Sequence, residues 1–244
     1  MVSIITNIGF DHQEFLGDTL EQIAIEKAGI IKQNTPVIIG ERHVATQKVF
    51  TEIAQNQHAP LFFAEEQENV CQDLPLEGYQ IKNFKTAMLA LKKLGFSYTS
   101  SQQLNAIKKL KEHTGFFGRL EILQQQPTII LDVSHNTAGI TATLPLIQQQ
   151  CKGQLYILYG AAKDKDAQQI LSLFPSNANV SACLFTNPRS KTAADWQNLK
   201  VNSIFDHIET AIEQLKMKMT STDLLWITGS FFLISDLKNQ AKQF

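Results

Sequence analysis

Polar side chains follow several apolar runs in the second half of the chain, where they could bind an anion. Asp132, His135 and Asn136 lie between a predicted buried strand and the start of a predicted helix. Backbone N–H groups at a helix start and the helix dipole favour an anion such as phosphate. Asn136 or Ser134 could equally serve only to cap that helix. The residues taken singly leave both interpretations open.

Two further charged groups in this half could contact a phosphorylated ligand. Asp164, Lys165 and Asp166 form a run that could orient a nucleotide or could be a solvated turn capping the next helix. Arg119 follows Gly118 and could reach a phosphate from a hinge, or could be a surface arginine. Nothing local decides between these alternatives.

Lys27 is the unusual residue of the first half. Counted at helical spacing from Leu20, the apolar face contains Ile23, Ala24 and Ile31, and position 27 falls on the same face. Burial would favour the neutral amine, which can add carbon dioxide and become a carbamate, an anionic metal ligand. Alternatively, Lys27 lies near the helix C-terminus, where its charge suits the dipole and its ammonium can reach water.

The elements that would position these residues alternate between short apolar runs and amphipathic runs. "VSIITNI", "PVIIG" and "APLFFA" predict strands, separated by a helix that Asp18 caps together with Glu21 and by the helix "VATQKVFTEIAQNQ". This β-α-β-α-β order is typical of a parallel sheet. "NFKTAMLALKKLG" and "SQQLNAIKKLKEH" predict two more helices, and the glycines of "TGFFG" indicate a domain boundary near Gly115.

The second half predicts a doubly wound α/β unit. A hairpin around "QQQP" is followed by the strands "QLYILYG", "VSACLFT" and "LLWITG", alternating with helices around 138–150, 166–174 and 207–217. Ligands of open parallel sheets gather beyond the carboxyl ends of the strands. The loops expected at a site are therefore "DVSHN", "GAAKDKD", "TNPRS" and "TGSFF".

Composition narrows the class of protein. With 244 residues and 43% hydrophobic content, the chain can form two domains. The 22 Lys and Arg against 23 Asp and Glu give no basic footprint for nucleic acid or an anionic membrane, so we expect a small-molecule ligand. Cys71, Cys151 and Cys183 are scattered, which favours buried free thiols, and no apolar run reaches the ~20 residues that a bilayer needs. We expect a cytoplasmic protein.

The motifs become specific when taken together and in order. "ITNIGFDHQEFLGDTLEQIAIEKAGIIK" resembles the central-domain signature of the folylpolyglutamate synthase and dihydrofolate synthase family, a branch of the Mur-type amide ligases. "FGRLEI", "ILDVSHNTAGI", "KDKD", "NPRS" and "ITGSFFLISDL" resemble its C-terminal domain. The resemblance implies the last part of a central ATPase domain in residues 1–115 and a Rossmann-like glutamate ligase domain in residues 116–244.

The resemblance also implies a reaction and a site. In this family ATP phosphorylates the carboxylate of dihydropteroate or of a folate, and the amine of L-glutamate then attacks the acyl phosphate to form an amide. By similarity, His12 and a carbamylated Lys27 would be catalytic and would hold Mg²⁺. Once the two domains close, ATP would be bound by Asn83, Arg119, Asp132 and His135. Lys165 and Ser230 would lie nearby.

The sequence departs from the family pattern in three places. "YQIKN" stands where His-Gln usually precedes the asparagine, and "FFGR" stands where Trp-Pro-Gly-Arg is usual. The phosphate-binding loop G-x-x-x-x-G-K-[ST] does not occur. We therefore expect a truncated form of the enzyme with an open hydrophobic sheet edge. A separate N-terminal chain that carries the loop could be its partner.

Two other functions stay open. The chain could be a non-catalytic fragment, either inert or a subunit of a split enzyme. It could also be a peptidoglycan Mur ligase that joins an amino acid to a nucleotide-linked muramoyl acid, although "LGDTLEQIAIEKAGIIK" favours the folate branch.

Overall fold

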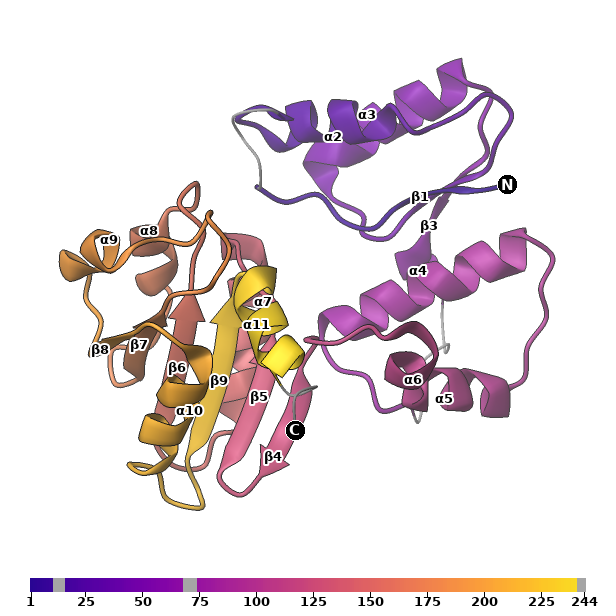
Figure 1. Cartoon of the computed structure of the whole chain (residues 1–244). Coiled ribbons are helices and arrows are strands. Elements are labelled where there is room, and N and C mark those ends of the chain that lie inside the picture. Colours follow the sequence, from indigo (N-terminus) through magenta and orange to yellow (C-terminus); the bar gives the residue numbers. More distant parts are fainter. Residues whose placement is uncertain (11–15, 68–73, 241–244) are drawn as a thin grey trace. The chain divides into compact units, whose positions relative to one another are not determined.

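The chain divides into two compact units, Met1–Gly115 and Phe116–Phe244. The structure is a computed structural model that describes residues 1–10, 16–67 and 74–240 (Figure 1). Within these residues, the strands form a three-stranded sheet in the N-terminal unit and a six-stranded sheet in the C-terminal unit. Over the same residues, no helix combines the length and the hydropathy needed to span a membrane.

The N-terminal unit has the predicted β-α-β-α-β order. Its strands are parallel and lie in the order β1-β2-β3. Side chains of a strand point alternately to its two faces: Val37 and Ile39 of β2 belong to the core that includes α2 and α3, whereas Ile38 packs with Leu89 and Ala90 of α4. The elements are β1 (Ser3–Ile5), α2 (Leu20–Ala28), β2 (Val37–Ile39), α3 (Val44–Asn56), β3 (Leu61–Phe63), η1 (Ala64–Glu66), α4 (Tyr79–Lys93), α5 (Ser100–Lys108) and α6 (Leu110–Thr114).

Helix α2 begins one residue later than the sequence predicts, so the expected capping by Asp18 and Glu21 is wrong. Thr19 is the N-cap, and its hydroxyl accepts a hydrogen bond from the Gln22 N–H (3.2 Å). The Gln22 side chain reaches back to accept from the N–H groups of Thr19 (3.2 Å) and Asp18 (2.8 Å). Gln22 is at the third helical position, from which its side chain can accept from both N–H groups. Glu21 is one position earlier, from which a side chain cannot reach them.

The C-terminal unit is the predicted doubly wound sheet, in the order β4-β5-β9-β6-β7-β8, with β4 antiparallel to β5 and the other pairs parallel. The strand β8 and the helices α9 and α11 were not predicted. The elements are β4 (Glu121–Gln125), β5 (Thr128–Asp132), α7 (Thr137–Gln150), β6 (Leu155–Gly160), α8 (Ala167–Leu171), β7 (Asn179–Cys183), α9 (Ala193–Gln197), β8 (Ser203–Phe205), α10 (Ile208–Lys216), β9 (Leu224–Gly229) and α11 (Phe231–Gln240).

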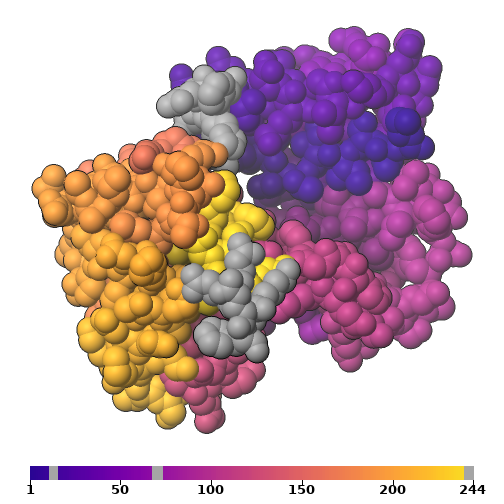
Figure 2. All heavy atoms as spheres, in the orientation of Figure 1, coloured from indigo at the N-terminus to yellow at the C-terminus, as the bar shows by residue number. Residues whose placement is uncertain are grey.

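Helices cover both faces of this sheet. Leu225 and Ile227 of β9 pack in a core with α10 and α11, and Trp226 packs in a second core with α7, α8 and α9. The space-filling view shows residues of α10 on the surface of the C-terminal unit (Figure 2). Cys183 is a buried free thiol, as expected, whereas Cys151 is a free thiol that is only partly buried. Burial raises the pKa of the Cys183 thiol to about 12, whereas Cys71 lies outside the described residues.

Candidate functional site

The loops that the sequence singles out come together at one edge of the C-terminal sheet. Strands β5, β9, β6 and β7 are neighbours and parallel, so their carboxyl ends lie at the same edge. The Gly229 N–H donates to the Ser134 carbonyl (2.9 Å), and the Ser230 N–H donates to the Gly160 carbonyl (2.8 Å). The Thr228 hydroxyl also donates to the Ser134 carbonyl (3.0 Å). These loops therefore form one connected structure.

Glycines at the ends of β6 and β9 permit this close approach. Gly229 has a φ of +108°, and a Cβ there would overlap the carbonyl of Gly160. A Cβ on Gly160 would lie 2.9 Å from the Leu233 side chain and 3.0 Å from the Cys183 carbonyl oxygen. Gly160 in "GAAKDKD" and Gly229 in "TGSFF" are thus required for the close packing of the two backbones.

Asp132 ends strand β5, and its side chain is fully buried. The carboxylate accepts hydrogen bonds from the N–H groups of Leu120 (2.9 Å) and Ser134 (3.0 Å) and from the Ser134 hydroxyl. The Thr143 hydroxyl lies 3.5 Å from the same carboxylate and 2.9 Å from the Ser134 hydroxyl. Asp132 therefore links the loop after β5 to the turn that carries Arg119.

Arg119 is exposed in a turn whose backbone is held at several points. Gly118 and Leu120, on either side of it, have φ values of +73° and +50°. The Gly118 carbonyl accepts from the Val133 N–H (2.9 Å), and the Gly118 N–H donates to the Glu121 carboxylate (2.9 Å). The Arg119 guanidinium lies 5.6 Å from the Phe116 ring centroid. The chain thus carries a cationic side chain on the turn whose Leu120 N–H is held by Asp132.

His135 and Asn136 begin the loop before α7. Asn136 is the N-cap of α7, and its side chain accepts from the Gly139 N–H (2.8 Å). The capping interpretation is therefore confirmed for Asn136, whereas the Ser134 hydroxyl bonds to Asp132 instead. His135 is partly buried, with Nδ1 3.0 Å from the Val133 carbonyl oxygen.

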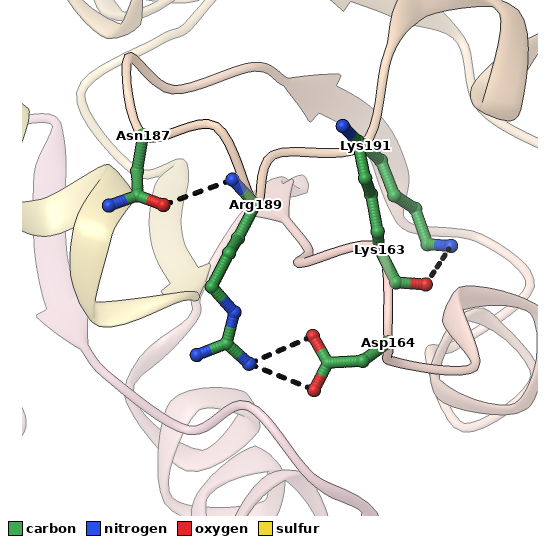
Figure 3. Close-up of polar contacts among 5 residues, drawn as sticks. All are labelled: Lys163, Asp164, Asn187, Arg189 and Lys191. Atoms are coloured by element: carbon green, nitrogen blue, oxygen red, sulfur yellow. Dashed lines mark hydrogen bonds and ion pairs between the residues drawn. The ribbon is translucent and has the colours of Figure 1, made fainter.

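The run from Asp164 to Asp166 is held at both ends. Asp166 caps α8 by accepting from the Gln169 N–H (3.0 Å). Arg189 Nη2 lies 3.0 Å from each carboxylate oxygen of Asp164 (Figure 3). Partial burial would raise the pKa of Asp164, but the hydrogen bond and charge of Arg189 outweigh it and hold that pKa below its ordinary value. Sequence reasoning proposed no role for Arg189.

Three further residues were expected at the site: Ser230, Asn83 and Lys27. The Ser230 hydroxyl, buried just before α11, accepts from the Phe232 N–H (3.2 Å). Asn83 is exposed on α4. Lys27 is exposed on α2, so the inward-facing interpretation is wrong and the alternative, in which its ammonium reaches water, is confirmed. Ala28 takes the buried position, because the apolar face is centred one residue further along the helix.

A metal site is not formed by the side chains that the structure describes. In the described ranges, no group of three or more His, Cys, Asp or Glu side chains could hold a metal ion. His12 lies outside the described residues. Lys27 alone does not amount to a donor set for a divalent cation, which prefers several oxygen ligands.

Comparisons with known proteins match nearly the whole chain. A family model described as Mur ligase, glutamate ligase domain, matches residues 118–231. The dihydrofolate synthase/folylpolyglutamate synthase of Bacillus subtilis is 26% identical over 270 residues, which cover 99% of this chain and 63% of that protein. The Escherichia coli protein of the same name is 25% identical over 254 residues, covering 96% and 58%. The chain therefore spans about three fifths of the length of these relatives.

A solved structure shows the same fold. The bifunctional folylpolyglutamate synthase/dihydrofolate synthase of Yersinia pestis, complexed with AMPPNP and a Mn ion, superposes with a TM-score of 0.82 at 23% identity. The superposition covers 99% of this chain and 61% of that one. Escherichia coli FolC, in complex with DHPP and ADP, also gives a TM-score of 0.82, at 24% identity.

Proposed function

We propose that this chain, whose residues 118–231 match the Mur ligase glutamate ligase domain family, takes part in the ATP-dependent ligation of L-glutamate to a folate or to dihydropteroate. The observation that carries this proposal is the joining of the loops after β5, β6 and β9 at the strand ends where ligands of such sheets bind. Relatives named for this activity match 99% and 96% of the chain.

The reaction proceeds in two steps. The acceptor carboxylate attacks the γ-phosphorus of ATP, which gives an acyl phosphate and ADP. The glutamate amine then attacks the acyl carbon, and the tetrahedral intermediate expels inorganic phosphate and loses a proton to leave the amide. Phosphate charge must be neutralised in the first step, and water must be excluded in the second.

Residues of the C-terminal unit suit the nucleotide. Arg119 offers a guanidinium whose turn is fixed by Asp132, and Lys165 offers an ammonium on a held loop. His135 and Ser230 lie at the starts of the loops that lead to α7 and α11. In the N-terminal unit, Asn83 is exposed on α4 and is proposed as a further nucleotide contact.

Magnesium is the cation that we propose for this reaction, held by His12 and by Lys27 as a carbamate. The solved Yersinia pestis relative contains manganese. A divalent cation would neutralise phosphate charge. The carbamate rests on the family resemblance, because Lys27 is exposed on α2 and burial therefore does not favour its neutral amine. Mass spectrometry of the native protein in bicarbonate buffer at neutral pH should find the added carbon dioxide on Lys27, and a Lys27→Ala variant should lack it.

The phosphate-binding loop that the sequence lacks would come from a segment outside these 244 residues, in the same or a separate chain. The test is incorporation of labelled L-glutamate by the chain mixed with such a segment, with dihydropteroate, tetrahydrofolate or a UDP-linked muramoyl acid as acceptor. We expect label in a pterin product. Label only in the UDP-linked product would identify a peptidoglycan ligase instead.

A further inference from the structure

The loops after β6 and β7 are tied to each other over a short stretch. The Lys163 N–H donates to the Arg189 carbonyl (2.8 Å), and the Lys191 N–H donates to the Ala161 carbonyl (3.0 Å). These two bonds form an antiparallel bridge between Ala162 and Ser190, although β6 and β7 themselves are parallel. The loop after β7 therefore turns back along the loop after β6.

Side chains reinforce the connection in both directions, and Figure 3 shows the contacts of Arg189 with Asp164 and of Lys191 with Lys163. Arg189 Nη2 donates to the Asp164 carboxylate, 3.0 Å from each oxygen. The Lys163 ammonium donates to the Pro188 carbonyl (3.0 Å), and the Lys191 ammonium donates to the Lys163 carbonyl (3.4 Å). Each of these three cations thus contacts the opposite loop.

These contacts fix the backbone on both sides of Lys165. Asp164, before it, is held by Arg189, and Asp166, after it, caps α8 through the Gln169 N–H. The Lys165 N–H itself donates to the Ala162 carbonyl (3.1 Å). The side chain of Lys165 therefore leaves the loop from a fixed point.

The pair is suited to positioning more than to stability. The side chains of Arg189 and Asp164 are 57% and 39% exposed, and ion pairs that exposed add little to folding stability. A guanidinium nevertheless has a fixed planar geometry and several donors, which orient a carboxylate better than the point charge of a lysine. Geometry is thus the main contribution that the pair can make.

We propose that Arg189, acting through Asp164, positions Lys165 to bind an anionic oxygen group of a substrate. The group is a phosphate of ATP or a carboxylate of L-glutamate. The inference rests on the proposed function, because it takes Lys165 as a ligand contact. Arg189 is then a positioning residue that does not itself touch the ligand.

Double-mutant analysis of ligand binding tests this role. AMPPNP and L-glutamate are titrated separately into the full 244-residue chain and into its Lys165→Met, Arg189→Met and doubly substituted forms. Arg189→Met should weaken binding of one ligand about three- to five-fold, the effect of an exposed ion pair. In the Lys165→Met background it should have no further effect, because Arg189 acts only through Lys165. Weaker AMPPNP binding identifies a phosphate, and weaker glutamate binding a carboxylate.

Matched variants separate positioning from general loss of structure. Asp164→Asn should reproduce Arg189→Met. Arg42→Met removes a comparable pair with Glu66, whose side chains are 41% and 58% exposed, and should bind as wild type. Hydrogen exchange of the Lys163 and Lys165 amides should become faster in Arg189→Met.

Several results would overturn the inference. Equal losses from Arg189→Met with and without Lys165 would show that the arginine acts independently. Unchanged affinity, or unchanged amide exchange, in Arg189→Met would show that the pair positions nothing. A wild-type chain that binds neither ligand, even when it is mixed with the segment that carries the phosphate-binding loop, would contradict the proposed function as well. Normal wild-type binding with an unaffected Arg189→Met would contradict this inference alone.

Discussion

Oδ2 of Asp132, at the end of β5, accepts a hydrogen bond from the backbone N–H of Leu120, 2.9 Å away. Leu120 directly follows the exposed Arg119 and has a φ of +50°, which a leucine adopts only under constraint. The resemblance implies that Asp132 faces ATP, yet its side chain is fully buried. We propose that Asp132 acts on the nucleotide indirectly, by holding the turn that presents Arg119.

Replacing Asp132 should therefore cost stability as well as binding. Asp132→Ala leaves the N–H groups of Leu120 and Ser134 without their acceptor, and an unsatisfied buried donor costs ~1–3 kcal/mol. The free energy of unfolding can be followed by tryptophan fluorescence, since both tryptophans, Trp196 and Trp226, are buried in the C-terminal unit. A loss no larger than that of Glu213→Ala, on the exposed side of α10, would contradict this role.

Two glycines with positive φ give a matched pair for the close approach of β6 and β9. Gly229 (φ +108°) has no room for a Cβ beside the Gly160 carbonyl, whereas Gly95 (φ +83°) has nothing within 4 Å. Gly229→Ala should destabilise the C-terminal unit by ~2–4 kcal/mol, through strain and overlap together. Gly95→Ala should cost only about 1 kcal/mol, in the other unit. Equal tryptophan-monitored transitions for the two variants would disprove the packing account.

Asp223 should make the C-terminal unit sensitive to acid. Burial would raise the pKa of Asp223, but hydrogen bonds from the N–H groups of Thr220 (2.6 Å) and Gln154 (2.7 Å) outweigh it and lower the pKa. A lowered folded-state pKa contributes stability above the unfolded value of about 3.9. That stability disappears as pH falls through the folded pKa.

The measurement is urea unfolding of wild type and Asp223→Asn at pH 7 and at pH 3. The Gln154 N–H donates to Oδ1 of Asp223 and the Thr220 N–H to Oδ2. Asparagine replaces one of these oxygens with an NH2 donor, so the variant should be less stable at pH 7. The difference should shrink at pH 3. Asp206→Asn, at an exposed site, should show no such trend, and a difference that grows with acidity would refute the assignment.

Lys27 and Ala28 should respond in opposite ways to substitution. Lys27→Ala, at an exposed helical site, should change unfolding free energy by less than about 0.5 kcal/mol. Ala28→Lys, at a buried site, should cost more than about 2 kcal/mol, since it forces a charge into the core. Far-ultraviolet circular dichroism can follow both. A large loss of unfolding free energy in Lys27→Ala would contradict this account and indicate that the Lys27 side chain points into the core.

Much of the fold could be predicted because each apolar run is either short and continuous or periodic. The loops after the strands of the C-terminal unit were also predicted, since parallel strands end at a common edge. The strand β8 and the helices α9 and α11 were missed. At three residues for β8 and five for α9, a hydrophobic period can hardly be recognised.

The orientation of individual side chains could not be predicted. Helical counting assigned Lys27 to the buried face, but that face is centred one residue further along and contains Ala28 instead. A shift of one residue is enough to exchange a buried position for an exposed one. The loop "TNPRS" was expected at the site, but the pairing of Arg189 with Asp164 depends on how two loops turn in space. The sequence predicts that Asp132 contacts a ligand. Its burial could not be predicted, because the turn at Gly118–Leu120 that bonds to its carboxylate is not evident from the sequence.

Phosphate release from ATP tests the central claim most directly. The purified chain is supplied with magnesium, L-glutamate and dihydropteroate or tetrahydrofolate, with and without a separately made segment that carries the phosphate-binding loop. We expect release that requires the acceptor, glutamate and the segment together, with one amide product formed per phosphate. A folded sample that releases no phosphate even with the segment would contradict the proposed ligase function and indicate a non-catalytic chain.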